Sequence, residues 1–390
     1  MPVQEAKSAK RRRRGGDFLA VLLLAAIVGG TGWLWWHEKH QPASSNRKGE
    51  TSAQPAKVPE PHQVIPSLVL VQRQPELPVV STDAVSSAVS TSNAPPETEP
   101  VTAEYPRPVK NLFEAQVALA QHAISPGAID GAIGSQTRAA LATFQRLQGL
   151  FPSRVLDTNT KSVLKLETPL LRDYVVTSND LARLQPVGKT WLAKSQQSAL
   201  DYETILELVA ERGHAYQSLI EKLNPDVDWN NVAPGTIVKI PDVVYPEPDD
   251  KAAFVIIHLS DKYLEAFGTE SNLLAHFPCS IAAKVEKRPV GELHVAVIAP
   301  HPNYTFDPAI FTDSPEAQAI GHKLVLPPGP NNPVGVAWIG LDKPGYGMHG
   351  TPGPEQIGRT ESHGCFRLAN WDAEYLVKLV WVGMPVYVEP

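Results

Sequence analysis

The stretch Ser362-His363-Gly364-Cys365-Phe366-Arg367 organises the C-terminal third of the chain, and His349 lies sixteen residues before its cysteine. Glycine and histidine flank Cys365 in a segment without apolar periodicity, which is typical of a residue on an exposed turn. A free thiol has a pKa of about 8.5 and is mostly protonated at neutral pH, so a nucleophilic cysteine needs a base nearby. We therefore predict Cys365 as a nucleophile and His349 as its base.

Two glycines complete the predicted site. Gly350 follows the histidine directly, and its carbonyl is the predicted acceptor that orients the imidazole, because no Asp or Asn is needed for that role. Gly364 precedes the cysteine, and its lack of a side chain lets backbone N–H groups face a developing oxyanion. Both positions are predicted catalytic residues.

The ordered set of motifs around this pair resembles the L,D-transpeptidase (YkuD-like) family, over residues 252 to 389. The motifs that carry the resemblance are Tyr346-Gly347-Met348-His349-Gly350-Thr351, Ser362-His363-Gly364-Cys365-Phe366-Arg367, Arg288-Pro289-Val290-Gly291, His301-Pro302-Asn303-Tyr304 and Asn332-Pro333-Val334-Gly335. The spacing of the whole set is specific, whereas an isolated cysteine and histidine would be weak support.

The resemblance implies a reaction on bacterial cell-wall peptides, without ATP, metal or another cofactor. Cys365 would attack the bond between the third residue of a stem tetrapeptide and its terminal D-alanine, and an amine of a second stem would resolve the thioester into a 3→3 cross-link. His349 would move the proton, and N–H groups at Gly364, Cys365 and His363 would hold the oxyanion. The predicted substrate-binding residues are Arg367, Ser362, Tyr304 and Trp338.

Other functions stay open for the same residues. Cys365 is one of two cysteines, and a disulfide with Cys279 is an alternative in an oxidising compartment. His349, His363 and Cys365 could supply three zinc ligands, although no fourth ligand lies at a suitable spacing. An L,D-carboxypeptidase that uses water as acceptor, and a non-catalytic wall-anchoring protein, are the rival functions.

Charge and hydropathy at the N-terminus predict a membrane anchor. The first 17 residues hold six Lys or Arg and two acids, so with a total of −6 the remainder carries −10, which disfavours nucleic acid as a partner. Residues 18–36 are almost wholly apolar, and nineteen helical residues span roughly the 30 Å of a bilayer core. Three tryptophans end this run, at 33, 35 and 36, as at a membrane interface.

This pattern predicts a basic cytoplasmic tail (1–17), a single-pass helix (18–36) in the inner membrane, and a catalytic domain in the periplasm or cell-wall space. A cleaved signal peptide is the alternative, although no convincing small-x-small cleavage site follows the run. Residues 37–104 contain ten prolines and no sustained apolar period, which predicts a disordered linker.

Two small domains are expected between the linker and the catalytic domain. Residues 105–168 predict a helical bundle, with Ser135 as a helix cap and a third helix over 157–166, and Ile129-Asp130-Gly131-Ala132-Ile133-Gly134 resembles the peptidoglycan-binding domain 1 family. Residues 174–243 begin and end as strands around two helices and resemble the α+β LysM fold, which implies glycan strands as a partner. An extra stretch over 185–200 departs from that family, so a spacer role is the alternative.

From residue 252 the pattern changes to β-branched and aromatic runs separated by Gly and Pro. We expect a mostly-β catalytic domain, a β-sandwich as the family resemblance implies, with one helix over 371–380 capped by Asn370. Residues 353–360, rich in Gly and Pro, would form a wall of the cleft.

Overall fold

The computed structural model describes residues 104–311, 314–359, 362 and 364–390. The predicted tail, anchor and all but the last residue of the predicted linker lie outside these ranges. Within them, no helix has the length and hydropathy needed to cross a membrane. The prediction of an N-terminal anchor therefore concerns residues that the structure does not describe.

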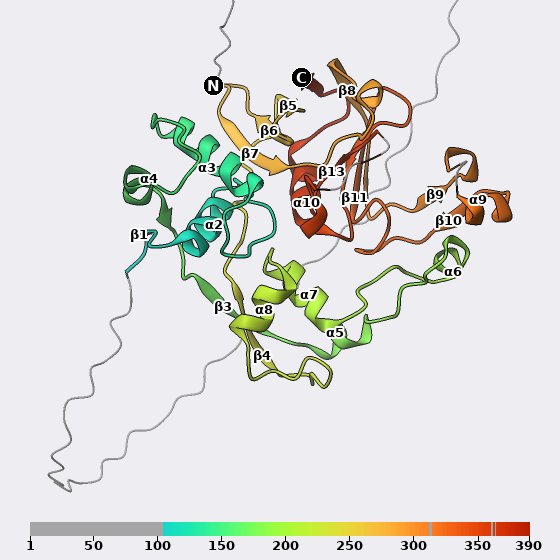
Figure 1. Cartoon of the computed structure of the whole chain (residues 1–390), viewed down its shortest axis with the longest axis horizontal. Coiled ribbons are helices and arrows are strands. Elements are labelled where there is room, and N and C mark those ends of the chain that lie inside the picture. Colours follow the sequence, from blue (N-terminus) through green and yellow to red (C-terminus); the bar gives the residue numbers. More distant parts are fainter. Residues whose placement is uncertain (1–103, 312–313, 360–361, 363) are drawn as a thin grey trace, which may run out of the picture. The chain divides into compact units, whose positions relative to one another are not determined.

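The helical bundle consists of α2 (Leu112–Gln121), α3 (Ser135–Leu147) and α4 (Thr158–Val163), with β1 (Arg107–Pro108) paired antiparallel to β2 (Lys165–Leu166) (Figure 1). Asn111 and Asp157 cap α2 and α4 by accepting backbone N–H groups of the first turn. Two sequence predictions were wrong here. Gly134 rather than Ser135 occupies the cap of α3, and the third helix ends at Val163 because the chain turns into β2 to pair with β1.

The next domain consists of β3 (Leu171–Val175), α5 (Ser178–Ala182), α6 (Trp191–Ser195), α7 (Ile205–Arg212), α8 (Gln217–Leu223) and β4 (Ile237–Pro241). β3 and β4 pair antiparallel along their whole length, so the two ends of the segment close on each other. We call this segment, residues 171–241, the βα module.

The extra stretch over 185–200 has a structural explanation. It contains α6, whose Trp191 stacks on Phe306 of the catalytic domain at a centroid distance of 4.5 Å. Leu200 at its end is fully buried beside Phe306 in a small core of its own. The insertion therefore docks the βα module onto the catalytic domain.

The catalytic domain is mostly β, as predicted. Its main sheet contains β5 (Phe254–His258), β6 (Tyr263–Phe267), β7 (Leu273–Pro278), β8 (Gly291–Pro300), β11 (Ala337–Leu341), β12 (Gly347–His349), β13 (Phe366–Arg367) and β14 (Pro385–Glu389). A hairpin of β9 (Tyr304–Phe306) and β10 (Leu324–Leu326) stands apart, and the helices are α9 (Pro315–Ile320) and α10 (Asn370–Leu379). Three short 3-10 turns cover Val285–Lys287, Pro308–Ile310 and Pro354–Gln356.

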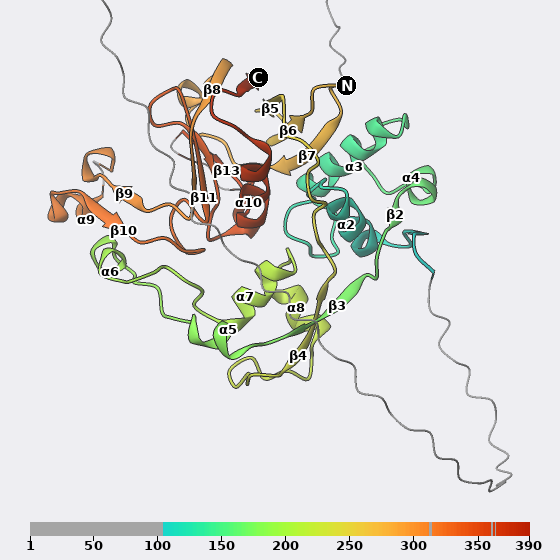
Figure 2. The same ribbon diagram turned by 180° about the vertical axis from the view of Figure 1, so that it is seen from behind.

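The strands form one series, β13-β12-β11-β8-β14-β5-β6-β7, rather than two separate sheets. The cause is β8, whose first four residues pair with β14 while the rest pair with β11. The β-sandwich prediction missed this change of partner in mid-strand. Helix α10 contacts β8, β11 and β12, and Figure 2 shows it beside β11.

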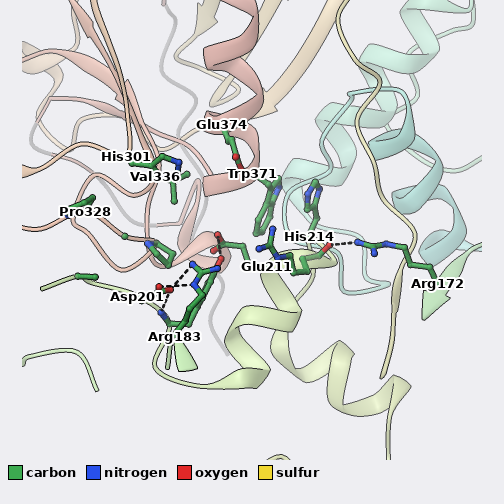
Figure 3. Close-up of a pocket in the computed structure, with 15 residues that line it drawn as sticks. Arg172, Arg183, Asp201, Glu211, His214, His301, Pro328, Val336, Trp371 and Glu374 are labelled. Carbon is green, nitrogen blue, oxygen red and sulfur yellow. Dashed lines mark hydrogen bonds and ion pairs between the residues drawn. The ribbon is translucent and has the colours of Figure 1, made fainter. Parts of the chain in front are cut away.

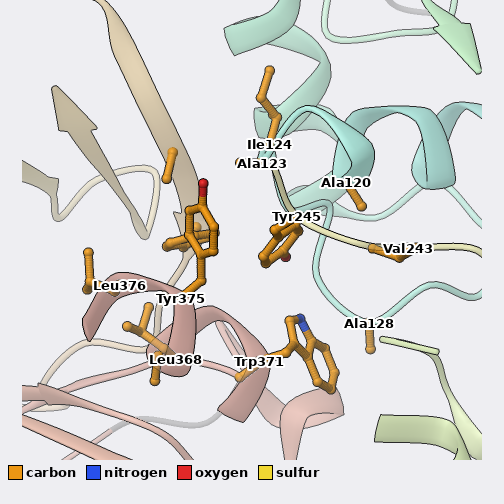
Figure 4. Packing of buried hydrophobic residues seen from close by; sticks show 14 of the residues in the cluster. Ala120, Ala123, Ile124, Ala128, Val243, Tyr245, Leu368, Trp371, Tyr375 and Leu376 are labelled. Atoms are coloured by element: carbon orange, nitrogen blue, oxygen red, sulfur yellow. The ribbon is translucent and has the colours of Figure 1, made fainter. Parts of the chain in front are cut away.

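One hydrophobic core runs through all three domains. Ile124 and Ala128 of the bundle, Tyr245 of the connecting segment and Trp371 of α10 all belong to it (Figure 4). At its centre, the Tyr245 ring meets Tyr375 edge-on, with centroids 5.0 Å apart. Buried apolar area of this kind is the main favourable term in folding, so the domains are mutually stabilising.

A buried ionic cluster joins α3 of the bundle to β6 and β7. Glu265 accepts hydrogen bonds from Arg146 at 2.6 Å and from Thr143 at 2.9 Å, and lies 3.3 Å from Nδ1 of the fully buried His276. Burial raises the pKa of Glu265, whereas hydrogen bonds from His258 and His276 and the charge of Arg146 lower it, and the net direction is strongly downward. The carboxylate is therefore ionised, and its charge is compensated by the arginine.

Candidate active site

The site is built at the β12–β13 edge of the main sheet. These two strands pair in parallel, with Met348 opposite Phe366 and His349 opposite Arg367, while Trp338 of β11 is the antiparallel partner of His349. Met348 and Phe366 are buried in the core. Because strand side chains alternate between faces, Trp338, His349 and Arg367 form a row on the opposite face.

Cys365 immediately precedes β13, and the Arg367 charge acts on its thiol. Its thiol donates to the Gly345 carbonyl at 3.5 Å, at the turn that leads into β12. The loop that carries it is fixed from behind, where the Ser280 and Arg367 backbones exchange hydrogen bonds of 2.9 and 3.0 Å. The turn that carries Cys365 is therefore held in place by the edge of the main sheet.

His349 is held in one tautomer. Its Nδ1 lies 2.7 Å from the Gly350 carbonyl, and a carbonyl only accepts, so Nδ1 carries the proton and Nε2 is left as a base. The ring is 5% exposed and stacks against Trp338 at 5.6 Å. A side chain at Gly347 would collide with this indole, so the glycine gives the tryptophan its place beside the histidine.

The resting pair is electrically neutral. Burial lowers the pKa of His349 to about 4, opposed by the hydrogen bond to Gly350, with the Arg367 charge adding to the lowering. Burial raises the pKa of Cys365 above its ordinary value, opposed by the Gly347 backbone N–H and by Arg367. At neutral pH the imidazole is therefore unprotonated, and the sulfur carries its proton.

Ser362 fastens the turn around the cysteine. Its hydroxyl donates to the Cys365 carbonyl at 2.5 Å and accepts the Gly364 N–H at 3.2 Å. The Gly364 N–H, one of the predicted oxyanion donors, is thus engaged by a neighbouring side chain. The Cys365 N–H makes no hydrogen bond to another residue in the part of the chain that the structure describes.

Tyr304 and Trp338 line one apolar cavity of about 390 Å³. Its walls are formed by Ala299, Pro302, Asn303, Tyr304, Thr305, Val334 and Trp338. Burial and, to a smaller degree, the Cys365 charge raise the pKa of Tyr304, while Arg367 opposes this. The cavity therefore adjoins the row of Trp338, His349 and Arg367.

The predicted cleft wall contacts both upstream domains. Gln136 of the bundle donates to the Ile357 carbonyl at 2.5 Å, and the Arg359 guanidinium lies 6.0 Å from the ring of Tyr216 in the βα module. The segment between the predicted base and the predicted nucleophile is thus framed by parts of the chain that precede the catalytic domain.

The sequence prediction that Asn370 caps the last helix was wrong, and the prediction for His363 stays untested. Asn370 is the first residue of α10, and the preceding Ala369 occupies the cap without a side-chain bond. The Asn370 side chain forms its hydrogen bonds with other residues around the site instead. Its neighbours Trp371 and Asp372 are both buried, so this helix start is a packed junction. His363 lies outside the described residues, and with it one ligand of the zinc alternative.

Both cysteines are free thiols in the structure. Cys279 is fully buried, and burial raises its pKa to about 12. Cys365 is partly exposed. The two thus differ as an inert core thiol and an accessible one.

Comparison with known proteins identifies two domains. Residues 252–388 match the family model of the L,D-transpeptidase catalytic domain, and residues 109–164 match that of the putative peptidoglycan binding domain. The putative L,D-transpeptidase YkuD of Bacillus licheniformis is 25% identical over 188 residues, which is 48% of this chain and 94% of that protein. The probable L,D-transpeptidase YbiS of Escherichia coli is 28% identical over 194 residues, 46% of this chain and 58% of that one.

Solved structures add a weaker likeness. L,D-transpeptidase 3 of Mycobacterium tuberculosis is 17% identical, with 41% of this chain and 77% of that chain covered, at a TM-score of 0.28. A score this low leaves the assignment to the sequence matches. On those matches, the chain is an enzyme with an L,D-transpeptidase catalytic domain, preceded by a domain of the peptidoglycan-binding type. The family resemblance predicted from the motifs is confirmed.

Proposed function

We propose that this enzyme cross-links peptidoglycan through an acyl-enzyme on Cys365. The proposal is carried by the position of Cys365 directly before β13, the strand that pairs with β12 of His349, whose Nδ1 is fixed to the Gly350 carbonyl. The sulfur attacks the carbonyl carbon of the third stem residue, the bond to D-alanine breaks, and a thioester forms. An amine of a second stem then attacks this thioester and releases the sulfur.

His349 moves the protons of both steps. Nε2 takes the thiol proton as the sulfur attacks and gives it to the departing D-alanine amine. In the second step it takes a proton from the incoming amine and gives it to the departing sulfur, which restores the neutral resting pair. The low pKa of the imidazole, about 4, keeps it neutral at rest at neutral pH, so it is available there as the first base.

The Cys365 N–H is the proposed oxyanion donor. The Gly364 N–H joins it only if the Ser362 hydroxyl gives up its present 3.2 Å hydrogen bond. One oxyanion donor is worth roughly 10²–10³ in rate. Ser362 therefore acts first as the clamp that holds the turn.

The stem peptide is proposed to bind along the row of Trp338, His349 and Arg367. The cavity beside Tyr304 takes an apolar part of the peptide, and Arg367 attracts its carboxylate, for which a guanidinium is well shaped. The bundle and the βα module, whose LysM-like character belongs to this proposal, would hold glycan strands. Residues 18–36 would anchor the chain in the inner membrane, with the catalytic domain on the cell-wall side.

Defined muropeptides test the proposal with the full chain, Cys365→Ala and His349→Ala. Mass spectrometry of the wild-type reaction is expected to find 3→3 dimers and released D-alanine. Cys365→Ala should form neither product, at an unchanged melting temperature, and His349→Ala should be slowed about 10²-fold or more. Tripeptides without dimers would instead establish the L,D-carboxypeptidase.

A non-catalytic wall-anchoring protein is the second outcome to exclude. Incubation with a carbapenem β-lactam, followed by intact-mass analysis, is expected to show one adduct on the wild-type chain and none on Cys365→Ala. Absence of both adduct and product would contradict the enzyme proposal. Retention on insoluble peptidoglycan, tested in the same Cys365→Ala protein, separately checks wall binding by the upstream domains.

A further inference from the structure

Asn370 uses every polar group of its side chain. It is 1% exposed, and its Nδ2 donates to the Pro330 carbonyl at 3.1 Å and to Glu211 Oε2 at 3.2 Å. Its Oδ1 accepts the Val336 N–H at 3.3 Å. A buried amide with all its hydrogen bonds satisfied fixes the groups around it.

The same Oδ1 packs directly against the backbone that follows the catalytic histidine. A β-carbon at Gly350 would collide with it, and so would one at Gly335. The Gly350 carbonyl is the acceptor that holds His349 Nδ1. The position of Asn370 therefore bears on the orientation of the imidazole through a single intervening residue.

The acceptor for Asn370 comes from outside the catalytic domain. Glu211 belongs to α7 of the βα module, and its carboxylate also accepts the Tyr202 hydroxyl at 3.0 Å. Among its charged neighbours are Glu207 and Arg212 on its own helix, which act on its pKa. Arg183 and Asp201 line the same cavity. Burial raises the pKa of Glu211 to about 7, against the hydrogen bonds from Asn370 and Tyr202.

The surrounding contacts hold Glu211 in place. His214, three residues further along the module, stacks on Trp371 of α10 with centroids 5.0 Å apart and planes at 9°. These residues line one wall of a cavity of about 440 Å³ (Figure 3). The module thus meets the first turn of α10 through the hydrogen bonds of Asn370 to Glu211 and through a ring stack.

We propose that Glu211 and Asn370 are positioning residues for acyl transfer, through which docking of the βα module sets the catalytic histidine. Glu211 holds the Asn370 amide, Asn370 holds the Gly350 segment, and the Gly350 carbonyl holds His349 with Nε2 unprotonated. This inference rests on the proposed function of His349 as the base. A catalytic domain whose module is undocked would then be a poor catalyst although its own fold is intact.

The test is the pH profile of Cys365 alkylation by iodoacetamide in the full chain, followed by peptide mapping. Glu211→Ala is expected to slow alkylation about tenfold, within the range of couplings carried by packed networks. It should also move the acid limb to lower pH, because the Gly350 hydrogen bond raises the imidazole pKa. Arg367 is the charged group that acts on both His349 and Cys365, and it is unchanged in every variant.

Two further variants separate positioning from packing. Glu211→Gln keeps an oxygen acceptor for Asn370 and is expected to retain the wild-type profile within about twofold. Glu207→Ala is the matched control, because Glu207 lies one turn earlier on α7 and accepts from Asn331 at 2.7 Å without a hydrogen bond to Asn370. It should leave the profile in place.

Buried Cys279 reports on the fold in the same experiment, since its alkylation requires opening of the core. If Glu211→Ala exposes Cys279, the decision passes to Glu211→Asp, which keeps the charge but withdraws it by one methylene and should shift the limb in the same direction. An unchanged profile in the folded variant, or an equal shift in Glu207→Ala, overturns the proposal. Iodoacetamide needs no cell-wall substrate, so a wild-type protein inactive on muropeptides would instead count against the proposed function.

Discussion

The catalytic domain meets its two upstream domains in different ways. The bundle contacts β6 and β7, at one end of the strand series, through the ionic cluster of Glu265. It also reaches the cleft wall through Gln136 and the first turn of α10 through Ser125. The βα module contacts the start of α10 and the β9–β10 hairpin, next to the strands that carry the site. The ionic cluster is therefore suited to stability, whereas the contacts of the βα module can also affect catalysis.

The largest expected effect on stability comes from the bundle interface. Glu265→Ala leaves the buried Thr143 and His276 without their shared partner, while Arg146, which is 46% exposed, can turn to water. A buried polar group left without a partner costs about 1–3 kcal/mol. We expect a loss of that size in the free energy of unfolding, measured by denaturant titration. The alkylation rate of Cys365 in the folded protein should stay within twofold. If Cys365 were alkylated more slowly in the fully folded variant, the bundle interface would also affect the site, and the two interfaces would not differ in their role.

Removing the ring that docks the βα module should affect both stability and substrate use. Trp191→Ala deletes the stack on Phe306 and is expected to cost about 2 kcal/mol of unfolding free energy. Because the Trp191 ring centroid also lies 6.1 Å from that of Tyr304, which lines the apolar cavity, KM for the stem peptide should rise severalfold. Leu192→Ala, on the same helix and 46% exposed, is the control and should change neither quantity.

We expect the Asp372 carboxyl, which lies in the shared core, to make the stability of the protein depend on pH. Burial raises the pKa of Asp372 to about 7, against hydrogen bonds from Tyr245 at 2.6 Å and Ser125 at 3.1 Å. The folded chain then holds this proton more tightly than the unfolded chain, whose Asp has a pKa of about 3.9. Stability from this group is complete below about pH 4 and declines as the pH rises toward 7.

Asp372→Asn removes this titration and keeps an oxygen acceptor. The unfolding free energy of the variant should therefore depend less on pH between 4 and 7 than that of the wild type, as followed by denaturant titration at several pH values. Ser125→Ala removes a hydrogen bond that favours the ionised form, so it should steepen the same dependence. Identical slopes in all three proteins would show that Asp372 does not hold a proton in the folded chain.

The smallest effect is expected from an exposed ion pair at the bundle interface. Arg154 bonds Asp261 at 2.8 Å, but the two side chains are 46% and 42% exposed. Exposed pairs of this kind contribute at most about 1 kcal/mol and are screened by salt. Arg154→Ala should change the melting temperature by no more than a few degrees, and a larger drop would show that the buried cluster is not what holds the bundle.

Local sequence pattern was sufficient for the catalytic motifs and for much of the domain. The strands over 254–258, 263–267 and 385–389 follow β-branched and aromatic runs, and the Gly350 carbonyl was expected as the acceptor for His349. Both features depend on neighbouring residues or on simple alternation, which a single sequence displays directly.

The rest depended on contacts between distant parts of the chain. Asn370 is a residue type that often caps helices, but its side chain forms hydrogen bonds with partners on α7 and next to β11 instead. The very short strands β12 and β13 have no period of their own and exist because they pair with each other and with β11. The Ser362 hydroxyl was expected at a turn, but its bond to the Gly364 N–H is a matter of loop geometry that spacing does not encode.

The continuous core has a practical consequence for anyone who wishes to shorten this enzyme. A fragment that starts at residue 252 would lose Tyr245 and Ile124, and would leave the flanks of Phe277, Tyr375 and Trp371 open to water. Such a truncation is expected to aggregate rather than to report the activity of a minimal catalyst. Inhibitor screens and crystallisation trials are therefore better served by a soluble fragment that begins near residue 104.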